Sequence, residues 1–183
     1  MDTSTRALEL VRSLRERERF NKIDYYDPYP YQRKFHKTGS EANQRLLMAA
    51  NRIGKSFSGA SEMSYHLTGL YPDWWEGRKF TQPITAWAGG VSNETTRDIV
   101  QYELLGSPDD PAAFGSGTVP RNKIIKTERK PGVPNAKSVA LIQHVTGGNS
   151  SLFFKAYEMG VDKWQGRSVD VVWLDEEPSR ELY

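Results

Sequence analysis

The sequence contains no cysteine among its 183 residues. This absence excludes disulfide bonds, thiolate zinc sites, iron–sulfur clusters and a cysteine nucleophile. Only three histidines are present, His36, His66 and His144, and none has a partner at metal-ligand spacing. We therefore interpret each histidine as a surface or packing residue. Any bound metal ion should be a hard cation held by oxygen atoms and phosphates.

Long hydrophobic runs are also missing. The longest stretch of consecutive apolar residues is Leu46–Ala50, far shorter than the roughly 20 residues of a transmembrane helix. The first residues, Met1–Ser4, do not lead into an apolar secretory segment. The charges nearly balance, because 25 Lys and Arg face 23 Asp and Glu. We expect a soluble intracellular protein without a membrane span.

Hydrophobic periodicity predicts an N-terminal helix that precedes one larger domain. Apolar residues recur at helical spacing from Ala7 to Leu14, behind the capping residues Thr3–Thr5. A linker rich in tyrosine and proline follows at residues 25–31. We therefore divide the chain into an N-terminal helix and linker, residues 1–28, and a main domain, residues 29–183.

Short apolar runs alternate with helical patterns in the main domain. Strands are predicted at 46–49, 84–88, 139–145, 152–157 and 169–174, and helices at 57–67 and 92–105. The two strands on either side of Thr146–Ser150 should form a hairpin. Alternation of apolar strands with helices predicts an α/β domain, with a mostly parallel central sheet flanked by helices.

The strongest functional signal is one short segment, which we call the Gly-Lys-Ser loop. Its residues are Ala49, Ala50, Asn51, Arg52, Ile53, Gly54, Lys55 and Ser56. They fit the phosphate-binding pattern G-x-x-x-x-G-K-[ST], except that Ala49 replaces the first glycine. Between a strand and a helix, the backbone N–H groups of such a loop wrap a polyphosphate. Gly54 then permits close approach, Lys55 contacts the β- and γ-phosphates, and Ser56 binds Mg²⁺.

A second signal is the acidic segment, residues 175–177. Here an apolar strand, Val171–Leu174, ends in Asp175, Glu176 and Glu177. Three adjoining carboxylates repel one another and are stabilised by a cation. In P-loop ATPases the first acid at this position helps to hold Mg²⁺, and the next can activate the attacking water. An acidic loop without catalytic function is the alternative, but the two signals together favour a nucleoside triphosphate site.

Two features of the sequence, Arg52 and the basic stretch 121–137, can each be interpreted in two ways. Arg52 could stabilise charge on the γ-phosphate, or it could form a structural salt bridge to a loop carboxylate. The stretch Arg121–Lys137 contains six basic residues and one acidic residue. It could contact the phosphates of duplex DNA, or it could be a solvated loop.

Three segments together resemble the large terminase subunit of tailed bacteriophages. They are the Gly-Lys-Ser loop, residues 71–77 and residues 164–178, and the resemblance extends from about Tyr29 to the last residue. It implies a RecA-like P-loop NTPase fold that is incomplete after the acidic (Walker B) strand. Proteins of this family are DNA-packaging motors with an ATPase domain followed by an RNase H-like nuclease domain. The nuclease is expected to be absent from these residues.

The resemblance also implies a Mg²⁺-dependent ATPase, with ATP and Mg²⁺ bound at matching positions. Lys55 and Ser56 would bind the phosphates and Mg²⁺, and Asp175 would hold Mg²⁺. Glu176 would be the catalytic base, and Arg52 would couple hydrolysis to movement.

Two further assignments come from the resemblance. Tyr31 and Gln32 match the glutamine motif that recognises adenine. Arg167 would be an arginine finger that reaches a neighbour's nucleotide, with Arg97 and Arg121 as other candidates for that finger.

The function implied by the resemblance is ATP-driven translocation of double-stranded DNA into a procapsid. The implied partners are double-stranded DNA, the portal protein, the small terminase subunit and further copies of the chain in a ring. The protein would lie in the host cell cytoplasm and dock transiently on the procapsid. Two alternatives remain: a helicase-like, nucleic-acid-stimulated ATPase, and a catalytically silent nucleotide-binding or docking module. Ala49 and the early end of the chain favour the silent module, whereas the intact Lys55, Ser56, Asp175 and Glu176 disfavour it.

Overall fold

A computed structural model describes residues 3–166 and 168–180. The helices are α1 (Thr3–Phe20), α2 (Pro30–Thr38), α3 (Lys55–Thr68), α4 (Asn93–Thr95) and α5 (Tyr102–Leu105), and the strands are β1 (Thr85–Gly90), β2 (Ile124–Arg129), β3 (Lys137–Gln143), β4 (Asn149–Ala156) and β5 (Val171–Leu174). A π-helical stretch, η2 (Thr96–Gln101), joins α4 to α5. Short 3₁₀ helices η5 (Tyr157–Met159) and η6 (Val161–Trp164) follow β4. The predicted α/β composition is confirmed.

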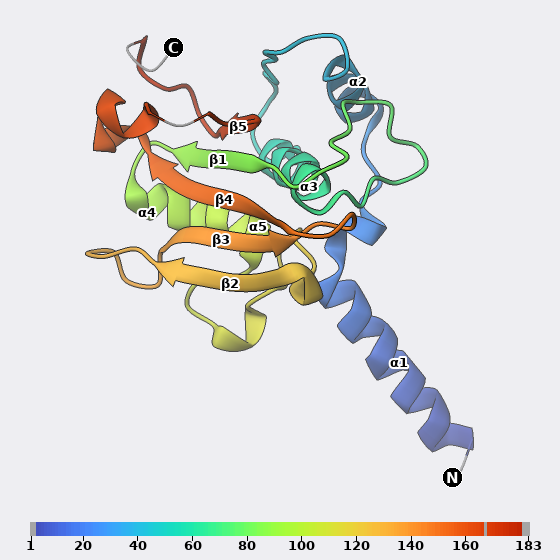
Figure 1. Ribbon diagram of the computed structural model, residues 1–183. Coiled ribbons are helices and arrows are strands. Elements are labelled where there is room, and N and C mark those ends of the chain that lie inside the picture. The colour runs from blue at the N-terminus through green and yellow to red at the C-terminus, as the bar shows by residue number, and fades with distance from the viewer. Residues whose placement is uncertain (1–2, 167, 181–183) are drawn as a thin grey trace.

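The strands form a five-stranded sheet in the order β2-β3-β4-β1-β5 (Figure 1). Strand β1 is parallel to both β4 and β5, whereas β2 and β3 pair antiparallel, as do β3 and β4. The prediction of a mostly parallel sheet is therefore correct for only part of it. The physical reason is that short connections join β2 to β3 and β3 to β4, and such connections can join only antiparallel strands. The predicted hairpin between β3 and β4 is confirmed.

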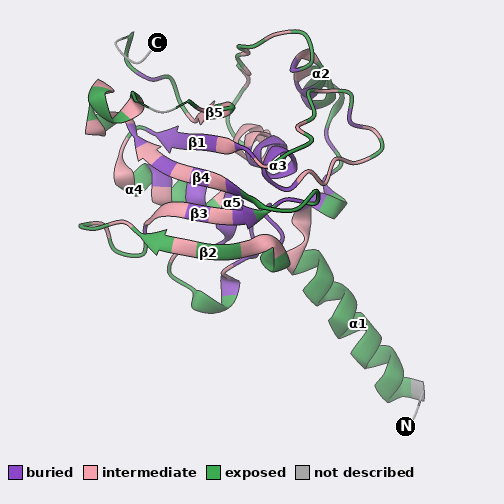
Figure 2. Cartoon of the chain, in the orientation of Figure 1, coloured by how far each residue is buried: buried purple, intermediate pink, exposed green. Residues whose placement is uncertain are grey.

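Helices cover one face of this sheet. Alternate residues of β1 and β4, among them Ala86 and Leu152, are in register and point to that face. There they pack with Met63 of α3 and Leu104 of α5 in a buried hydrophobic cluster. Figure 2 shows this buried layer along α3, β1 and β4. Because β4, β1 and β5 run parallel, their carboxyl ends lie at the same edge of the sheet.

A second, aromatic cluster packs on the other side of α3. Its buried members are Ile23, Tyr26, Tyr65 and Trp75. The indole N–H of Trp75 donates to the carbonyl of Arg78, so the polar edge of the ring has a partner. Tyr26 of the tyrosine-rich segment, and Ile23 just before the segment, are therefore packed into the core.

Helix α1 forms as the periodicity predicts, but its apolar side chains do not pack on the domain. Leu8 and Leu10 are 60% and 62% exposed. The helix projects away from the sheet and is exposed along its length (Figures 1 and 2). Within the described part of the chain, neither α1 nor any other helix is long and apolar enough to span the membrane.

One strand prediction is wrong, and one strand was not predicted. Residues 46–49 form no strand, and Leu46 and Met48 are 76% and 81% exposed. A strand needs a hydrogen-bonded neighbour, and no described strand pairs with this segment. Conversely, part of the basic stretch 121–137, which was expected to be a strip or a loop, forms the edge strand β2. An edge strand buries little of either face. Apolar and polar residues therefore alternate too weakly in β2 for its sequence to predict a strand.

Candidate functional site

The Gly-Lys-Ser loop leads directly into the first turn of α3. Gly54 caps this helix with φ of 81°, a left-handed conformation that glycine adopts without strain. The helix begins at Lys55, so its unpaired N–H groups lie at the loop. The helix that was predicted to follow the loop is confirmed, although the strand predicted before it is absent. A helix N-terminus preceded by such a loop can bind a polyphosphate.

The acidic segment lies beside this helix N-terminus. The Ser56 hydroxyl donates a hydrogen bond to Asp175 Oδ1 at 3.1 Å, across 119 positions of sequence. The Lys55 ammonium donates to the backbone carbonyls of Ala49 and Ala50, both at 2.7 Å. The structure thus brings together the serine, the lysine and the first carboxylate that the sequence analysis selected.

The electrostatic environment of Asp175 favours a cation. Burial raises the pKa of this carboxyl, and the nearby charge of Glu176 raises it further, while the Ser56 hydrogen bond and Lys55 oppose these effects. A nearby cation would offset this cost of ionisation. Ser56 and Asp175 offer the hard oxygen donors that Mg²⁺ prefers, so the residues present fit this ion.

These two side chains alone do not enclose a metal ion. The described residues contain no group of three or more histidine, cysteine or acidic side chains that could hold one. This arrangement is typical of Mg²⁺, which is usually bound by one or two protein oxygens together with substrate phosphates and waters.

The backbone is strained at two positions of the site. Arg52 and Glu176 have φ of 62° and 65°, a region that non-glycine residues rarely adopt. The third such residue, Asn135, lies in the turn between β2 and β3. Strain of this kind persists only where surrounding contacts impose it, and it clusters at functional sites.

The N-terminus of α2 contacts the Gly-Lys-Ser loop. The Tyr31 hydroxyl donates to the carbonyl of Ile53 at 2.5 Å, and Gln32 Nε2 donates to that of Gly54 at 3.2 Å. Gln32 Oε1 accepts from the N–H of Tyr29 at 2.8 Å, which caps α2. Both residues therefore contact the loop, and recognition of adenine stays a prediction.

The arginines of interest differ in their surroundings. In the described part of the chain Arg52 is exposed and forms no ion pair, so the salt-bridge alternative is not observed. Arg97 pairs with Asp98, and Arg121 stacks on the ring of Phe20. Arg167 lies outside the described residues, so its assignment as a finger stays a prediction.

A buried polar network next to α3 was not predicted. Glu62 accepts hydrogen bonds from Arg45, and its two carboxylate oxygens lie within hydrogen-bond distance of His36 and His66. Burial raises the pKa of Glu62, but its bonds to His36, His66 and Arg45 outweigh burial and hold the pKa well below the usual range. His36 and His66 are indeed packing residues. No sequence signal identified the network, because its members come from α2, α3 and the segment before the loop.

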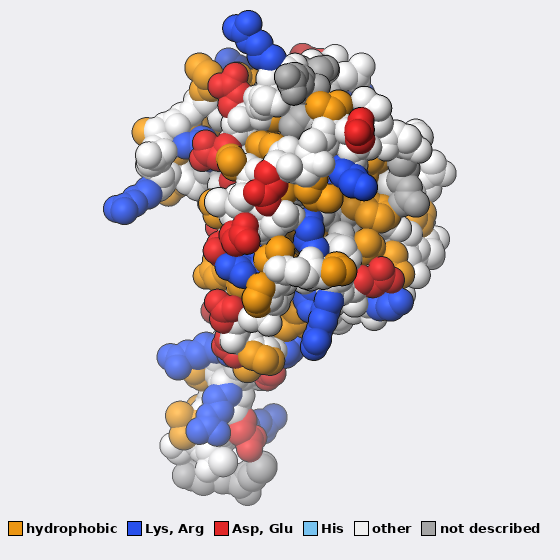
Figure 3. All heavy atoms as spheres, turned by 90° about the vertical axis from the view of Figure 1, so that its left-hand side faces the viewer, with side chains coloured by type: hydrophobic (Ala, Val, Ile, Leu, Met, Phe, Trp, Pro, Cys, Tyr) orange, Lys and Arg blue, Asp and Glu red, His pale blue; other side chains and the backbone are white. Residues whose placement is uncertain are grey.

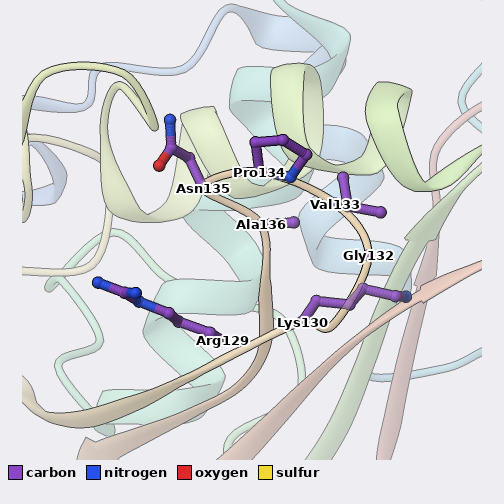
Figure 4. Close-up of a pocket in the computed structure, with 7 residues that line it drawn as sticks. All are labelled: Arg129, Lys130, Gly132, Val133, Pro134, Asn135 and Ala136. Carbon is purple, nitrogen blue, oxygen red and sulfur yellow. The ribbon is translucent and has the colours of Figure 1, made fainter.

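A depression of about 450 Å³ lies elsewhere, at the turn between β2 and β3 (Figure 4). Its lining contains none of the predicted site residues. Arg129 and Lys130 point in opposite directions there (Figure 4). These two neighbouring basic side chains therefore do not lie on the same side of the turn.

The chain belongs to the family of terminase large subunits. A family model described as "Terminase large subunit, T4likevirus-type, N-terminal" matches residues 46–183. The matched range includes both the Gly-Lys-Ser loop and the acidic segment. The predicted resemblance is therefore confirmed.

One curated relative is the terminase large subunit of Salmonella phage P22. It is 35% identical over 196 aligned positions, which cover 96% of this chain and 39% of the phage P22 protein. The chain thus spans about two fifths of the length of this relative. No solved structure matches the chain significantly.

Proposed function

We propose that this chain is the ATP-hydrolysing part of a terminase large subunit, with a RecA-like P-loop fold. The observation that supports the proposal most is the 3.1 Å contact between the Ser56 hydroxyl and Asp175. It joins the end of the Gly-Lys-Ser loop to a carboxylate that directly follows strand β5. A P-loop NTPase needs this pair of oxygen donors for Mg²⁺.

Each residue of the site has a task in this mechanism. The N–H groups at the start of α3 bind the phosphates, and Lys55 exchanges one or more of its loop carbonyl partners for phosphate oxygens. Ser56 and Asp175 would hold Mg²⁺, and the bound ion would supply positive charge opposite the phosphates. Glu176 accepts a proton from the attacking water. Arg52, exposed at the loop, stabilises the charge that develops on the γ-phosphate.

The wider role is movement of double-stranded DNA into a procapsid. The family membership supports it, as does the name of the phage P22 relative. We propose double-stranded DNA, a portal protein, a small terminase subunit and further copies of the chain in a ring as partners, in the host cell cytoplasm.

The surface charge bears on how the chain would contact DNA. The side of the molecule that includes the carboxyl ends of β1 and β4 shows basic and acidic side chains intermixed with hydrophobic ones (Figure 3). This mixture agrees with the net charge of +2. Contact with DNA on that side would therefore depend on a few individual basic residues and not on a broad positive field.

A catalytically silent nucleotide-binding module is the second candidate. One observation favours it: Lys55 is already bonded to two carbonyls of its own loop, at 2.7 Å each. In that case the chain would not hydrolyse ATP, even where it binds the nucleotide.

Calorimetric titration of Mg-ATPγS separates these candidates. The wild type should bind, and Lys55→Ala should weaken binding by at least about tenfold, or 1.4 kcal/mol. Lys34→Ala, at an exposed lysine of α2, is the matched control and should bind like the wild type. Equal binding by Lys55→Ala, or binding without any hydrolysis of ATP, would favour the silent module.

A further inference from the structure

We infer that Tyr157 is a positioning residue that fixes the backbone of the acidic segment. Its hydroxyl lies 2.8 Å from the carbonyl oxygen of Asp175 and 3.1 Å from that of Glu176. The carbonyl of Gly89, at the end of β1, lies 3.4 Å away. The inference rests on the proposed function, because it concerns how the proposed base Glu176 is oriented.

The hydroxyl is placed by rigid parts of the fold. Tyr157 directly follows β4, whose carboxyl end lies beside those of β1 and β5 at one edge of the sheet. The next residue, Glu158, donates its N–H to the carbonyl of Val91 at 3.2 Å. Its carboxylate accepts from both the backbone and the side chain of Asn93. The Tyr157 ring also contacts the indole of Trp164, with centroids 5.8 Å apart.

Glu176 needs such a contact because its own backbone is strained. At φ of 65° a glutamate is in the left-handed region, and it remains there only if neighbouring groups impose this conformation. The Tyr157 hydroxyl, with its single proton, lies within hydrogen-bond distance of the carbonyls on either side of this strained φ. The N–H of Asp175 also donates to the carbonyl of Gly89 at 2.8 Å, which anchors the start of the segment.

Loss of the Tyr157 hydroxyl should change the position of the Glu176 carboxylate and not the affinity for the nucleotide. The Glu176 side chain is exposed, and among the described residues no hydrogen bond or ion pair holds its carboxylate. The backbone therefore sets the Cα–Cβ direction from which this flexible side chain reaches the site. If the hydroxyl is lost, φ can relax toward negative values and the carboxylate turns away from the position required for proton transfer. The proposed phosphate-binding groups, the N–H groups at the start of α3, belong to a different element.

The test is Tyr157→Phe, which removes one oxygen atom and keeps the ring. We expect kcat for ATP to fall about tenfold, the value of one well-placed hydrogen bond, while the Kd for Mg-ATPγS stays within about twofold. Tyr102→Phe, at a half-exposed tyrosine of α5, should change neither value. An unchanged kcat in Tyr157→Phe would overturn the inference, and so would a collapse of folding, because the residue would then be merely structural.

A second readout separates this inference from the proposed function. The amide resonances of Glu176 and Glu177 should shift in nuclear magnetic resonance spectra of Tyr157→Phe and stay in place in Tyr102→Phe. If the wild type hydrolyses no ATP but these resonances shift, the positioning contact stands and the proposed function fails. If the wild type hydrolyses ATP and the resonances do not move, the positioning role fails and the proposed function stands.

Discussion

Gly59 of α3 lies directly against the indole of Trp173 in β5. A Cβ atom at position 59 would lie 2.8 Å from both Cε2 and Nε1 of that ring, closer than real Cβ contacts. Trp173 lies two residues before Asp175 in the sequence. The absence of a side chain at Gly59 therefore allows the start of α3 to approach the acidic segment.

Gly59→Ala should separate α3 from β5. We expect it to destabilise the protein by about 1–3 kcal/mol as an overpacked contact, even though alanine favours helices by about 1 kcal/mol over glycine. The Ser56–Asp175 contact should lengthen, so Mg-ATPγS should bind more weakly. Urea denaturation and calorimetry measure the two effects.

The double variant Gly59→Ala/Trp173→Leu tests the cause. A smaller side chain at 173 makes room for the added methyl group, so the two changes should cost less together than their sum. If Gly59→Ala alone stabilises the protein, the close approach of α3 and β5 does not exist.

Glu62→Gln should strongly destabilise the fold. The carboxylate is 7% exposed and is bonded to Arg45, His36 and His66. Removing its charge leaves Arg45 without a partner for its charge in a largely buried site, which typically costs about 3–5 kcal/mol. Glu128→Gln is the control, because its ion pair with Lys126 is exposed and should matter little. Similar denaturation midpoints for both variants would contradict this account.

The lowered pKa of Glu62 also predicts that the protein loses stability in acid. In the folded protein the pKa of Glu62 is held far below its ordinary value of 4.5. The contribution of Glu62 to the free energy of unfolding is therefore complete above pH 4.5 and declines as the pH falls below 4.5. The wild type should lose stability steeply below about pH 4.5. The slope for Glu62→Gln should be shallower in that window. Parallel curves, measured by urea denaturation at several pH values, would exclude Glu62 as the source.

The sequence predicted the parts of the fold that local pattern determines. The helix predicted at 92–105 corresponds to the helical run from Asn93 to Leu105, and the helix predicted at 57–67 corresponds to α3. The strand at 46–49 was mispredicted because apolar composition alone does not supply a hydrogen-bonded neighbour. The combination of parallel and antiparallel strands in the sheet also depends on which strands pair over long sequence distances. Hydrophobic periodicity does not predict this pairing.

The candidate site was predicted in its motifs but not in its supporting contacts. The Gly-Lys-Ser loop and the acidic segment each have a local pattern that chemistry explains. Tyr157 and the Glu62 network have none, because their partners are distant in sequence and meet only through the sheet order and helix packing. The strained φ values of Arg52 and Glu176 likewise arise from contacts that no local pattern encodes.

Removing most of α1 should leave the rest of the fold intact. Its side chains Leu8, Leu10, Val11 and Leu14 are all 44% or more exposed, so deletion loses little buried apolar area. Contacts to the domain come from its last residues, including Phe20, whose ring is covered by Arg121 at 4.1 Å. Deletion of residues 1–15 should shift Tm by less than about 2 °C, whereas Phe20→Ala should lower Tm more. A large drop on deletion would show that α1 packs on the domain.

Asp175→Asn should make the ligand-free protein more stable while it impairs the site. Burial, with Glu176, raises the pKa of Asp175. A carboxyl whose pKa is higher in the folded protein than in the unfolded chain stabilises the fold at pH values below the pKa of the unfolded chain. This stabilisation is lost as the pH rises through the pKa of the folded protein. At pH 7 the ionised side chain therefore costs stability, and asparagine removes that cost while it can still accept the Ser56 hydrogen bond.

Thermal melts with and without Mg-ATPγS measure both halves of this prediction. Asp175→Asn should melt a few degrees above the wild type without ligand, and the difference should shrink as the pH falls toward 3.8, the ordinary value for this carboxyl. Added Mg-ATPγS should raise the Tm of the wild type and have less effect on the variant, since Mg²⁺ loses a charged ligand. Asp162→Asn, at an exposed position of η6, should match the wild type in both measurements. A lower Tm for Asp175→Asn together with a full response to Mg-ATPγS would show that Asp175 is a structural residue and not a ligand of Mg²⁺.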